Sequence, residues 1–206
     1  MGTLIKRLRP ATLLDYGCGD GVLLKYLPRG LEVTLYDISR RALSLAEDAA
    51  QQPVAICRKR QALLTRKFDV IVFSLVLICL SRRAEYRQIL KLFKRIVSAT
   101  GVVLIAVPHP CFRGVAFASY RARYSKKQPF CYNTAQHQFE VALFAEGAPT
   151  FTFSDYHWSL SDTINLACEA GFLVRRVHEW KDVQSAKRSA NECFPPFLVV
   201  ELVVAQ

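Results

Sequence analysis

Short apolar runs alternate with helical patterns over the first half of this chain, and this alternation restricts the folds open to it. The apolar runs, nearly continuous in Val, Ile and Leu, lie at 11–17, 31–37, 54–59, within 68–80 and at 102–108. The helical patterns lie at 22–27, 40–52 and 85–100, the second beginning after Ser39 as N-cap and the third ending at Gly101. Strands covered on both faces need such runs, and the helices between them cross over a parallel sheet. The pattern predicts an α/β fold with a doubly wound, mostly parallel sheet.

The alternation breaks between residues 108 and 157, where two short stretches read like antiparallel strands. A helix over 159–172, capped by Ser159 or Ser161, and two C-terminal strands follow. We expect a single domain over 1–206, in which 108–157 forms a substrate cap inserted between the fifth and sixth strands.

The composition indicates a globular protein with a basic surface. Of 206 residues, 51% are hydrophobic and 22% are charged, which suffices for a buried core and excludes intrinsic disorder. The 28 Lys and Arg against 17 Asp and Glu give a net charge of +11, which favours anionic partners. The seven cysteines form no CxxC pair and fit a reducing, cytoplasmic compartment. We expect no metal site, and no apolar run is long enough to cross a membrane.

A glycine-rich turn follows the first apolar run. Gly17, Gly19 and Gly21 lie between that run and the next helical pattern, and Asp37 lies where the second run ends. Glycines let backbone N–H groups approach a ligand that lies across the strand ends. A carboxylate after the second strand can accept hydrogen bonds from both hydroxyls of a ribose. The two features predict a site for a cofactor that contains a nucleoside.

Two details separate the cofactor classes that use this geometry. A dinucleotide site has the spacing GxGxxG, which would place the third glycine at position 22, where this chain has Val22. Asp15 precedes the turn, and its carboxylate would repel a pyrophosphate but suits the ammonium group of S-adenosylmethionine (SAM). The sequence therefore predicts SAM as the cofactor rather than NAD.

Four stretches resemble motifs of the class I SAM-dependent methyltransferases. They are D-Y-G-C-G-D-G (15–21), Y-D-I-S (36–39), F-D-V-I-V-F-S-L-V-L (68–77) and V-P-H-P-C-F (107–112). The resemblance implies a Rossmann-like sheet of seven strands whose last strand is antiparallel. It also implies methyl transfer with S-adenosyl-L-homocysteine (SAH) as the product.

The resemblance assigns the cofactor contacts residue by residue. It implies that Gly17, Cys18, Gly19 and Gly21 line the loop under SAM and that Asp15 lies close to the methionine amino group. It implies that Asp37 binds the ribose hydroxyls and that Ile38 and Gln61 contact the adenine. Ser74 and Leu75 are implied to form the floor beneath the methionine and the substrate side. Gln61 is included because the family often places an acidic or polar residue after the third strand to hold the adenine amine.

The chain departs from the family pattern in two further respects. About ten residues precede the first strand, so a cover over SAM is expected from 108–157 or from a partner chain. The fourth strand is followed by Ser-Leu-Val-Leu rather than the (D/N)PP(Y/F) tetrapeptide. This difference argues against the subgroup that methylates adenine N6 and related amide or base nitrogens.

Two histidines are candidates for a general base, which helps when the nucleophile is a hydroxyl and is dispensable for a neutral amine. His109 follows the fifth strand between two prolines, at the edge where ligands of open α/β sheets lie. His157 stands beside Trp158 before a helix. The alternatives are that His109 fixes the Pro-His-Pro turn and that His157 is a half-buried structural residue.

Acceptor-binding residues are expected in the inserted segment. Its cations, with no acid among them, are Arg113, Arg121, Arg123, Lys126 and Lys127. Such a run can bind a carboxylate, a phosphate or an RNA backbone, and it can also be a solvated face. We expect the acceptor to contact Arg113, Tyr120, Tyr132 and Trp158, although the aromatic residues could instead form the core of the cap.

The residues and the resemblance together predict a SAM-dependent methyltransferase that acts on an oxygen or nitrogen atom of a small, anionic molecule. Two alternatives stay open: an RNA or nucleotide methyltransferase, which the basic charge supports, and a SAM-binding partner protein without catalysis. We expect a cytoplasmic monomer or homodimer that does not associate with membranes.

Overall fold

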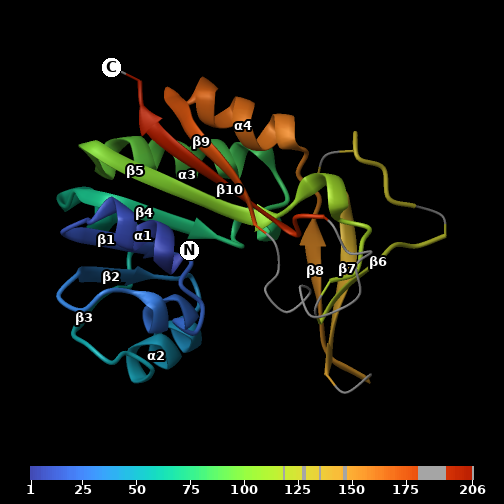
Figure 1. Ribbon diagram of the computed structural model, residues 1–206, viewed down its shortest axis with the longest axis horizontal. Helices are drawn as coiled ribbons and strands as arrows, with labels where there is room; N and C mark the ends of the chain where they lie inside the picture. The colour runs from blue at the N-terminus through green and yellow to red at the C-terminus, as the bar shows by residue number, and fades with distance from the viewer. Residues whose placement is uncertain (118, 127–128, 135, 146–147, 181–193, 206) are drawn as a thin grey trace.

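In the computed structural model, a sheet of seven strands forms the centre of the molecule (Figure 1). In spatial order its strands are β3 (Val54–Cys57), β2 (Glu32–Tyr36), β1 (Thr12–Tyr16), β4 (Phe68–Ser74), β5 (Val97–Pro108), β10 (Phe197–Val204) and β9 (Phe172–Trp180). Strands β1 to β5 pair in parallel, and β10 is antiparallel to both of its neighbours. The predicted Rossmann-like sheet with an antiparallel last strand is confirmed. The structure describes residues 1–117, 119–126, 129–134, 136–145, 148–180 and 194–205.

Helices cover both faces of this sheet. One face carries α1 (Gly2–Leu8), η1 (Val22–Tyr26) and α2 (Arg40–Asp48), and the other carries η2 (Arg60–Thr65), η3 (Leu77–Cys79), α3 (Arg83–Ile96) and α4 (Leu160–Glu169). Side chains alternate along a strand, so Leu13 packs in the core of the first face and Leu14 in that of the second. Among the residues placed by the structure, no helix is both long and apolar enough to cross a membrane.

The predicted helix starts agree with the structure better than the predicted ends. Ser39 caps α2 by accepting a hydrogen bond from the Ala42 N–H (3.2 Å), and Ser159, rather than Ser161, caps α4. The helix end predicted at Gly101 is wrong, because α3 ends at Ile96 and β5 begins at Val97. Val97 pairs with β4, so strand pairing overrides the helical pattern there.

A second, antiparallel sheet lies between β5 and α4 in the sequence. It consists of β6 (Tyr120–Arg123), β7 (Gln138–Ala145) and β8 (Ala148–Tyr156), and η4 (Pro110–Phe112) precedes it. The two strands predicted within 108–157 are confirmed as β7 and β8. In Figure 1 this small sheet stands to one side of the central sheet. Lys127, one of the cations predicted to meet an acceptor, lies outside the described residues.

A buried ion pair ties the start of this segment to its last strand. Arg113 follows η4 and donates to Asp155 of β8 at 2.8 Å, with side-chain exposures of 2% and 0%. The guanidinium carbon also lies 5.4 Å from the ring centre of Tyr120 and 4.7 Å from that of Phe139. Among the described residues, Asp155 Oδ1 and two of the three Arg113 nitrogens have no hydrogen-bond partner. The removal of either partner would leave an uncompensated charge inside the small sheet.

We therefore expect Arg113→Ala to lower the free energy of unfolding by roughly 3–5 kcal/mol, the cost of breaking a buried ion pair. Arg123→Ala is the matched control: Arg123 pairs with Glu140, both side chains are about half exposed, and such pairs contribute about 0–1 kcal/mol. Urea denaturation followed by circular dichroism measures both. The double variant Arg113→Met/Asp155→Leu should recover most of the loss, because it removes both charges. Equal losses in the two single variants would contradict this account.

Candidate functional site

A cavity of about 1110 Å³ opens at the carboxyl ends of β1, β2 and β4. Its wall combines the turn after β1, the residues after β2 and β4, and parts of α1, η1, η2, η3 and α3. In an open α/β sheet this edge is where ligands bind. The volume is slightly above the roughly 300–1,000 Å³ of typical small-molecule sites, so the cavity is large enough for a ligand of nucleoside size with space left over.

The turn after β1 is held against the end of β2. The N–H groups of Gly17 and Cys18 both donate to the Tyr36 carbonyl, at 2.7 and 3.1 Å. Gly17 has a φ of +80°, and a Cβ atom there would lie 2.3 Å from a methyl carbon of Val76. Glycine is therefore required at position 17 both for the backbone conformation and for the close approach of the segment after β4.

Gly19 is the residue of the turn whose backbone faces empty space. It has a φ of +54°, and a Cβ atom built there would meet nothing within 4 Å, although Gly19 lines the cavity. A side chain at this position would fill space that a ligand can otherwise use. The bare backbone fits a cofactor that, like SAM, lies directly on the turn.

Asp37 is locked in one orientation at the end of β2. Its Oδ2 accepts from the Gly19 N–H (2.9 Å) and its Oδ1 from the Ser39 N–H (2.8 Å). Each carboxylate oxygen keeps a further lone pair that can accept from a ligand hydroxyl. The next residue, Ile38, is 90% exposed although it is apolar, and it also lines the cavity. A carboxylate beside an uncovered apolar side chain fits a ribose followed by a flat ring.

Asp15 presents a buried carboxyl group to the cavity. It is 3% exposed, and no cation in the described part of the chain forms an ion pair with it. Burial, with a smaller contribution from the charge of Asp37, raises the pKa of Asp15 to about 7. Burial and the same two carboxylates raise the pKa of the neighbouring Cys18 thiol to about 12, so that thiol stays protonated. A ligand ammonium beside Asp15 would compensate the buried charge, which fits the methionine end of SAM.

The segment after β4 closes the cavity on the next side. Ser74 and Leu75 line it, and Leu75 is 44% exposed. Leu75 has a φ of +59°, which is uncommon for a residue with a side chain, and its N–H donates to the Ala106 carbonyl at 2.8 Å. Such backbone conformations persist where neighbouring contacts impose them, and they cluster at ligand sites.

Most of the predicted cofactor residues meet in this one cavity. They are Asp15, Gly17, Cys18, Gly19, Asp37, Ile38, Ser74 and Leu75. Gly21 and Gln61 do not line it. A Cβ atom on Gly21 would lie 3.0 Å from Ala46, so this glycine lets the turn pack on α2. Arg60 occupies the place in the wall that was expected for Gln61.

Three helices contribute wall residues that the sequence motifs do not indicate. They are Met1, Gly2, Thr3 and Lys6 of the N-terminal segment, Val22, Leu23, Lys25 and Tyr26 of η1, and Glu85, Gln88 and Ile89 of α3. The N-terminal segment supplies part of the cover that was expected from 108–157, and no described residue of 108–157 lines this cavity. Gly2 is one sequence signal of this packing. A Cβ atom there would lie 2.7 Å from Tyr26, so glycine allows α1 to pack closely against η1.

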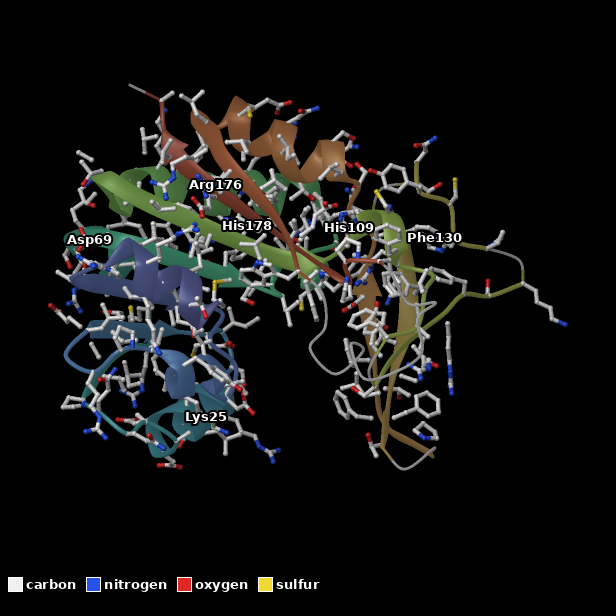
Figure 2. The ribbon with its side chains drawn as sticks, in the orientation of Figure 1. Lys25, Asp69, His109, Phe130, Arg176 and His178 are labelled. Carbon is white, nitrogen blue, oxygen red and sulfur yellow. The ribbon has the colours of Figure 1, made fainter. Side chains whose placement is uncertain are left out.

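The two predicted bases lie outside the cavity wall. His109 is 5% exposed and lies between the two sheets (Figure 2), where its Nε2 meets Glu179 at 2.9 Å and its Nδ1 accepts from the Cys111 N–H. His157 is fully buried, and its Nε2 lies 2.8 Å from the Tyr132 carbonyl. Burial is the main cause that lowers the pKa of His157, which keeps the ring neutral.

The predicted acceptor-binding residues pack in or beside the small sheet. Arg113 and Tyr120 are buried together there. The Trp158 indole N–H donates to the Leu80 carbonyl at 3.1 Å, and the Tyr132 hydroxyl accepts from the Leu160 N–H at 3.0 Å. None of these four side chains lines the cavity. Leu80 does line it, so Trp158 contacts the cavity wall on the side that faces away from the cavity.

Comparisons with known proteins agree with this geometry. Residues 2–153 match the model of a family described as "Methyltransferase domain", and no curated protein matches the sequence. Similar solved structures include the CcbJ methyltransferase from Streptomyces caelestis (17% identity, TM-score 0.71, 100% of this chain and 88% of that chain). Others are a SAM-dependent methyltransferase from Clostridium acetobutylicum (12%, 0.63, 99% and 89%) and the glycopeptide N-methyltransferase MtfA with sinefungin (15%, 0.70, 99% and 85%).

At these identities the solved structures show a common fold, whereas the family model covers more than half of the chain. The chain therefore belongs to the methyltransferase-domain family, and it is a class I SAM-dependent methyltransferase.

Proposed function

We propose that this methyltransferase acts on an oxygen or nitrogen atom of a small molecule that carries a negative charge. The observation that carries the proposal is a cavity of about 1110 Å³ with room for an acceptor beside the cofactor. Lys6 and Lys25 line its wall, and no described acid forms an ion pair with either. Each of these two ammonium groups is available to pair with an anionic ligand. The glycopeptide N-methyltransferase MtfA, which has a similar fold, is named for transfer to nitrogen.

We assign the cofactor contacts to the residues around the glycine turn. Asp15 pairs with the ammonium group, Asp37 accepts from the ribose hydroxyls, and Gly19 leaves room for the ligand on the backbone. Bound SAM supplies a methyl group on a positively charged sulfur. The protein positions the two reactants, because it holds the acceptor atom in line with that methyl group and keeps water away.

His109 and His157 stay predictions as proton acceptors for a hydroxyl nucleophile, as do Arg113, Tyr120, Tyr132 and Trp158 as acceptor contacts. All six are engaged in contacts within or beside the small sheet. A direct role would require the small sheet to approach the cavity when an acceptor binds. An amine or an acidic hydroxyl acceptor needs no base, and the reaction then requires none of these residues.

The net charge of +11 supports one alternative, transfer to RNA or a nucleotide. A SAM-binding protein without catalysis is the other alternative. For the location we propose the cytoplasm: the six cysteines that the structure describes are all free thiols, which suits a reducing compartment. We propose a monomer or a homodimer.

A methyl-transfer assay distinguishes these functions. Incubation of the protein with SAM labelled in the methyl group and a pool of small carboxylic acids, phenols and amines should give labelled small molecules, with anionic acceptors preferred. Total RNA, tested separately, should stay unlabelled. Label in RNA alone would establish the RNA alternative, and SAM binding without transfer to either pool would indicate the partner protein.

The pH dependence of SAM binding tests the role of Asp15. Because the pKa of Asp15 is about 7 in the free protein, the affinity for SAM should rise about tenfold per pH unit between pH 5 and 7 and then level off. Asp15→Asn should bind SAM at least tenfold more weakly at pH 7.5, with no rise over this range. Calorimetry at a series of pH values measures both proteins, and a flat profile for the unmodified protein would contradict the assignment.

The same substitution should have the opposite effect on stability. The raised pKa means that the folded state binds the Asp15 proton more tightly than the unfolded chain, so this group costs stability as the pH rises from about 4 to 7. Ligand-free Asp15→Asn should therefore unfold at a higher temperature than the unmodified protein at pH 8. The difference should shrink at pH 5, where Asp15 is protonated.

Gly19→Ala tests whether the cofactor lies on the turn. The Cβ atom meets no protein atom, so the variant should fold with a loss of about 1–2 kcal/mol from its positive φ, but it should no longer bind SAM. Gly30→Ala is a matched control: Gly30 has a φ of +80°, also meets nothing within 4 Å, and lies outside the cavity wall. The control should show a similar loss of stability and normal SAM binding. Normal binding by Gly19→Ala would place the cofactor elsewhere.

A further inference from the structure

A cofactor that contacts Asp15 and Asp37 must direct its adenine ring toward the end of β3. Asp15 is on β1 and Asp37 follows β2, and β3 is the next strand in the sheet. Arg60, the first residue of η2, follows β3 and lines the cavity there, and the same cavity is lined by Glu85 and Gln88 of α3, a helix that contacts η2. This step rests on the proposed function, in which Asp15 and Asp37 hold the methionine and ribose ends of SAM.

The exocyclic amine of adenine donates hydrogen bonds, so it needs an acceptor in this wall. Arg60 cannot serve, because a guanidinium group only donates. Glu85 can accept only, because a carboxylate has no donor for the ring nitrogen beside the amine, and its Oε1 already accepts from the Arg82 Nε and Nη2 atoms at 3.1 and 2.6 Å. Gln61, the residue expected from the sequence, does not line the cavity.

Gln88 lines the same wall, and its carboxamide offers both an acceptor oxygen and an NH₂ donor. Its amide forms no hydrogen bond with another residue that the structure describes. Glu85, Gln88 and Ile89 are spaced i, i+3 and i+4, so they lie on one face of α3, and all three line the cavity. A carboxamide suits adenine in particular, because its oxygen accepts from the amine while its NH₂ group donates to the adjacent ring nitrogen.

We propose that Gln88 recognises the adenine amine of the cofactor and that Arg60 faces the ring nitrogens, which are acceptors. The contact usually expected after the third strand is thus supplied from α3. Gln88 is a specificity-determining residue: it selects adenine over other purines and leaves the binding of the methionine end to Asp15.

Calorimetry with two ligands tests this assignment. The ligands are SAH and its 6-deamino analogue, in which hydrogen replaces the adenine amine. The unmodified protein should prefer SAH about tenfold, the value of one well-formed hydrogen bond. Gln88→Ala should bind SAH about tenfold more weakly and bind both ligands equally. Gln88→Glu should keep a preference for SAH, because a carboxylate also accepts from the amine.

Lys91→Ala is the control variant, since Lys91 is exposed on the next turn of α3 and lies outside the cavity wall. It should behave as the unmodified protein does, and thermal unfolding checks that each variant is folded. A preference for SAH that survives in Gln88→Ala, or its absence from the unmodified protein, would overturn the role of Gln88 and leave the proposed function intact. Failure of the unmodified protein to bind SAH would overturn both.

Discussion

The geometry of the cavity depends on two hydrogen bonds to one carbonyl group. The N–H groups of Gly17 and Cys18 share the Tyr36 oxygen, which joins the turn after β1 to the last residue of β2. Tyr16 and Tyr36 are direct neighbours in the parallel register, so the turn begins level with the end of β2. The same fold of the chain brings the Gly19 N–H to Asp37. These hydrogen bonds therefore join the turn and the carboxylate of Asp37 into one unit. The unit is held together by the protein alone, without a bound cofactor.

This unit can be predicted from the sequence because its causes are local. Three glycines within five residues require a turn, and a continuous apolar run before them requires a buried strand. The acidic residues stand at the two strand ends, and adjacent parallel strands present those ends at the same edge. The five parallel strands follow from runs of apolar residues in the same way, whereas the antiparallel last strand was implied by the resemblance to the family. Where the causes were not local, as at Val97, pairing with β4 overrode the helical pattern.

The rest of the cavity wall depends on tertiary packing, and sequence spacing does not reveal it. Gln88 lies on a helix whose other face is buried, and the packing of α3 against η2, α4 and β5 brings it to the cavity. The basic run of the inserted segment shows the same limit. Its cations look alike in sequence, yet Arg113 is buried against Asp155 whereas Arg123 pairs at the surface with Glu140. The sequence of a charged run does not predict which of its residues face solvent. Their exposure depends on the acidic partners on β7 and β8, which come later in the chain.

The small sheet contacts the cavity wall through η3 and does not line the cavity with any described residue. Strand β8 packs against η3, and just beyond β8 the Trp158 indole donates to the Leu80 carbonyl, whose residue is part of the cavity wall. Cys79 lies in the same wall, and the charge of Asp155 adds to burial in raising the pKa of its thiol. These contacts support the segment after β4, where Leu75 holds an uncommon backbone conformation. Because Leu75 borders the methionine end of the proposed cofactor site, the inserted segment is connected to that end through η3, although none of its described residues lines the cavity.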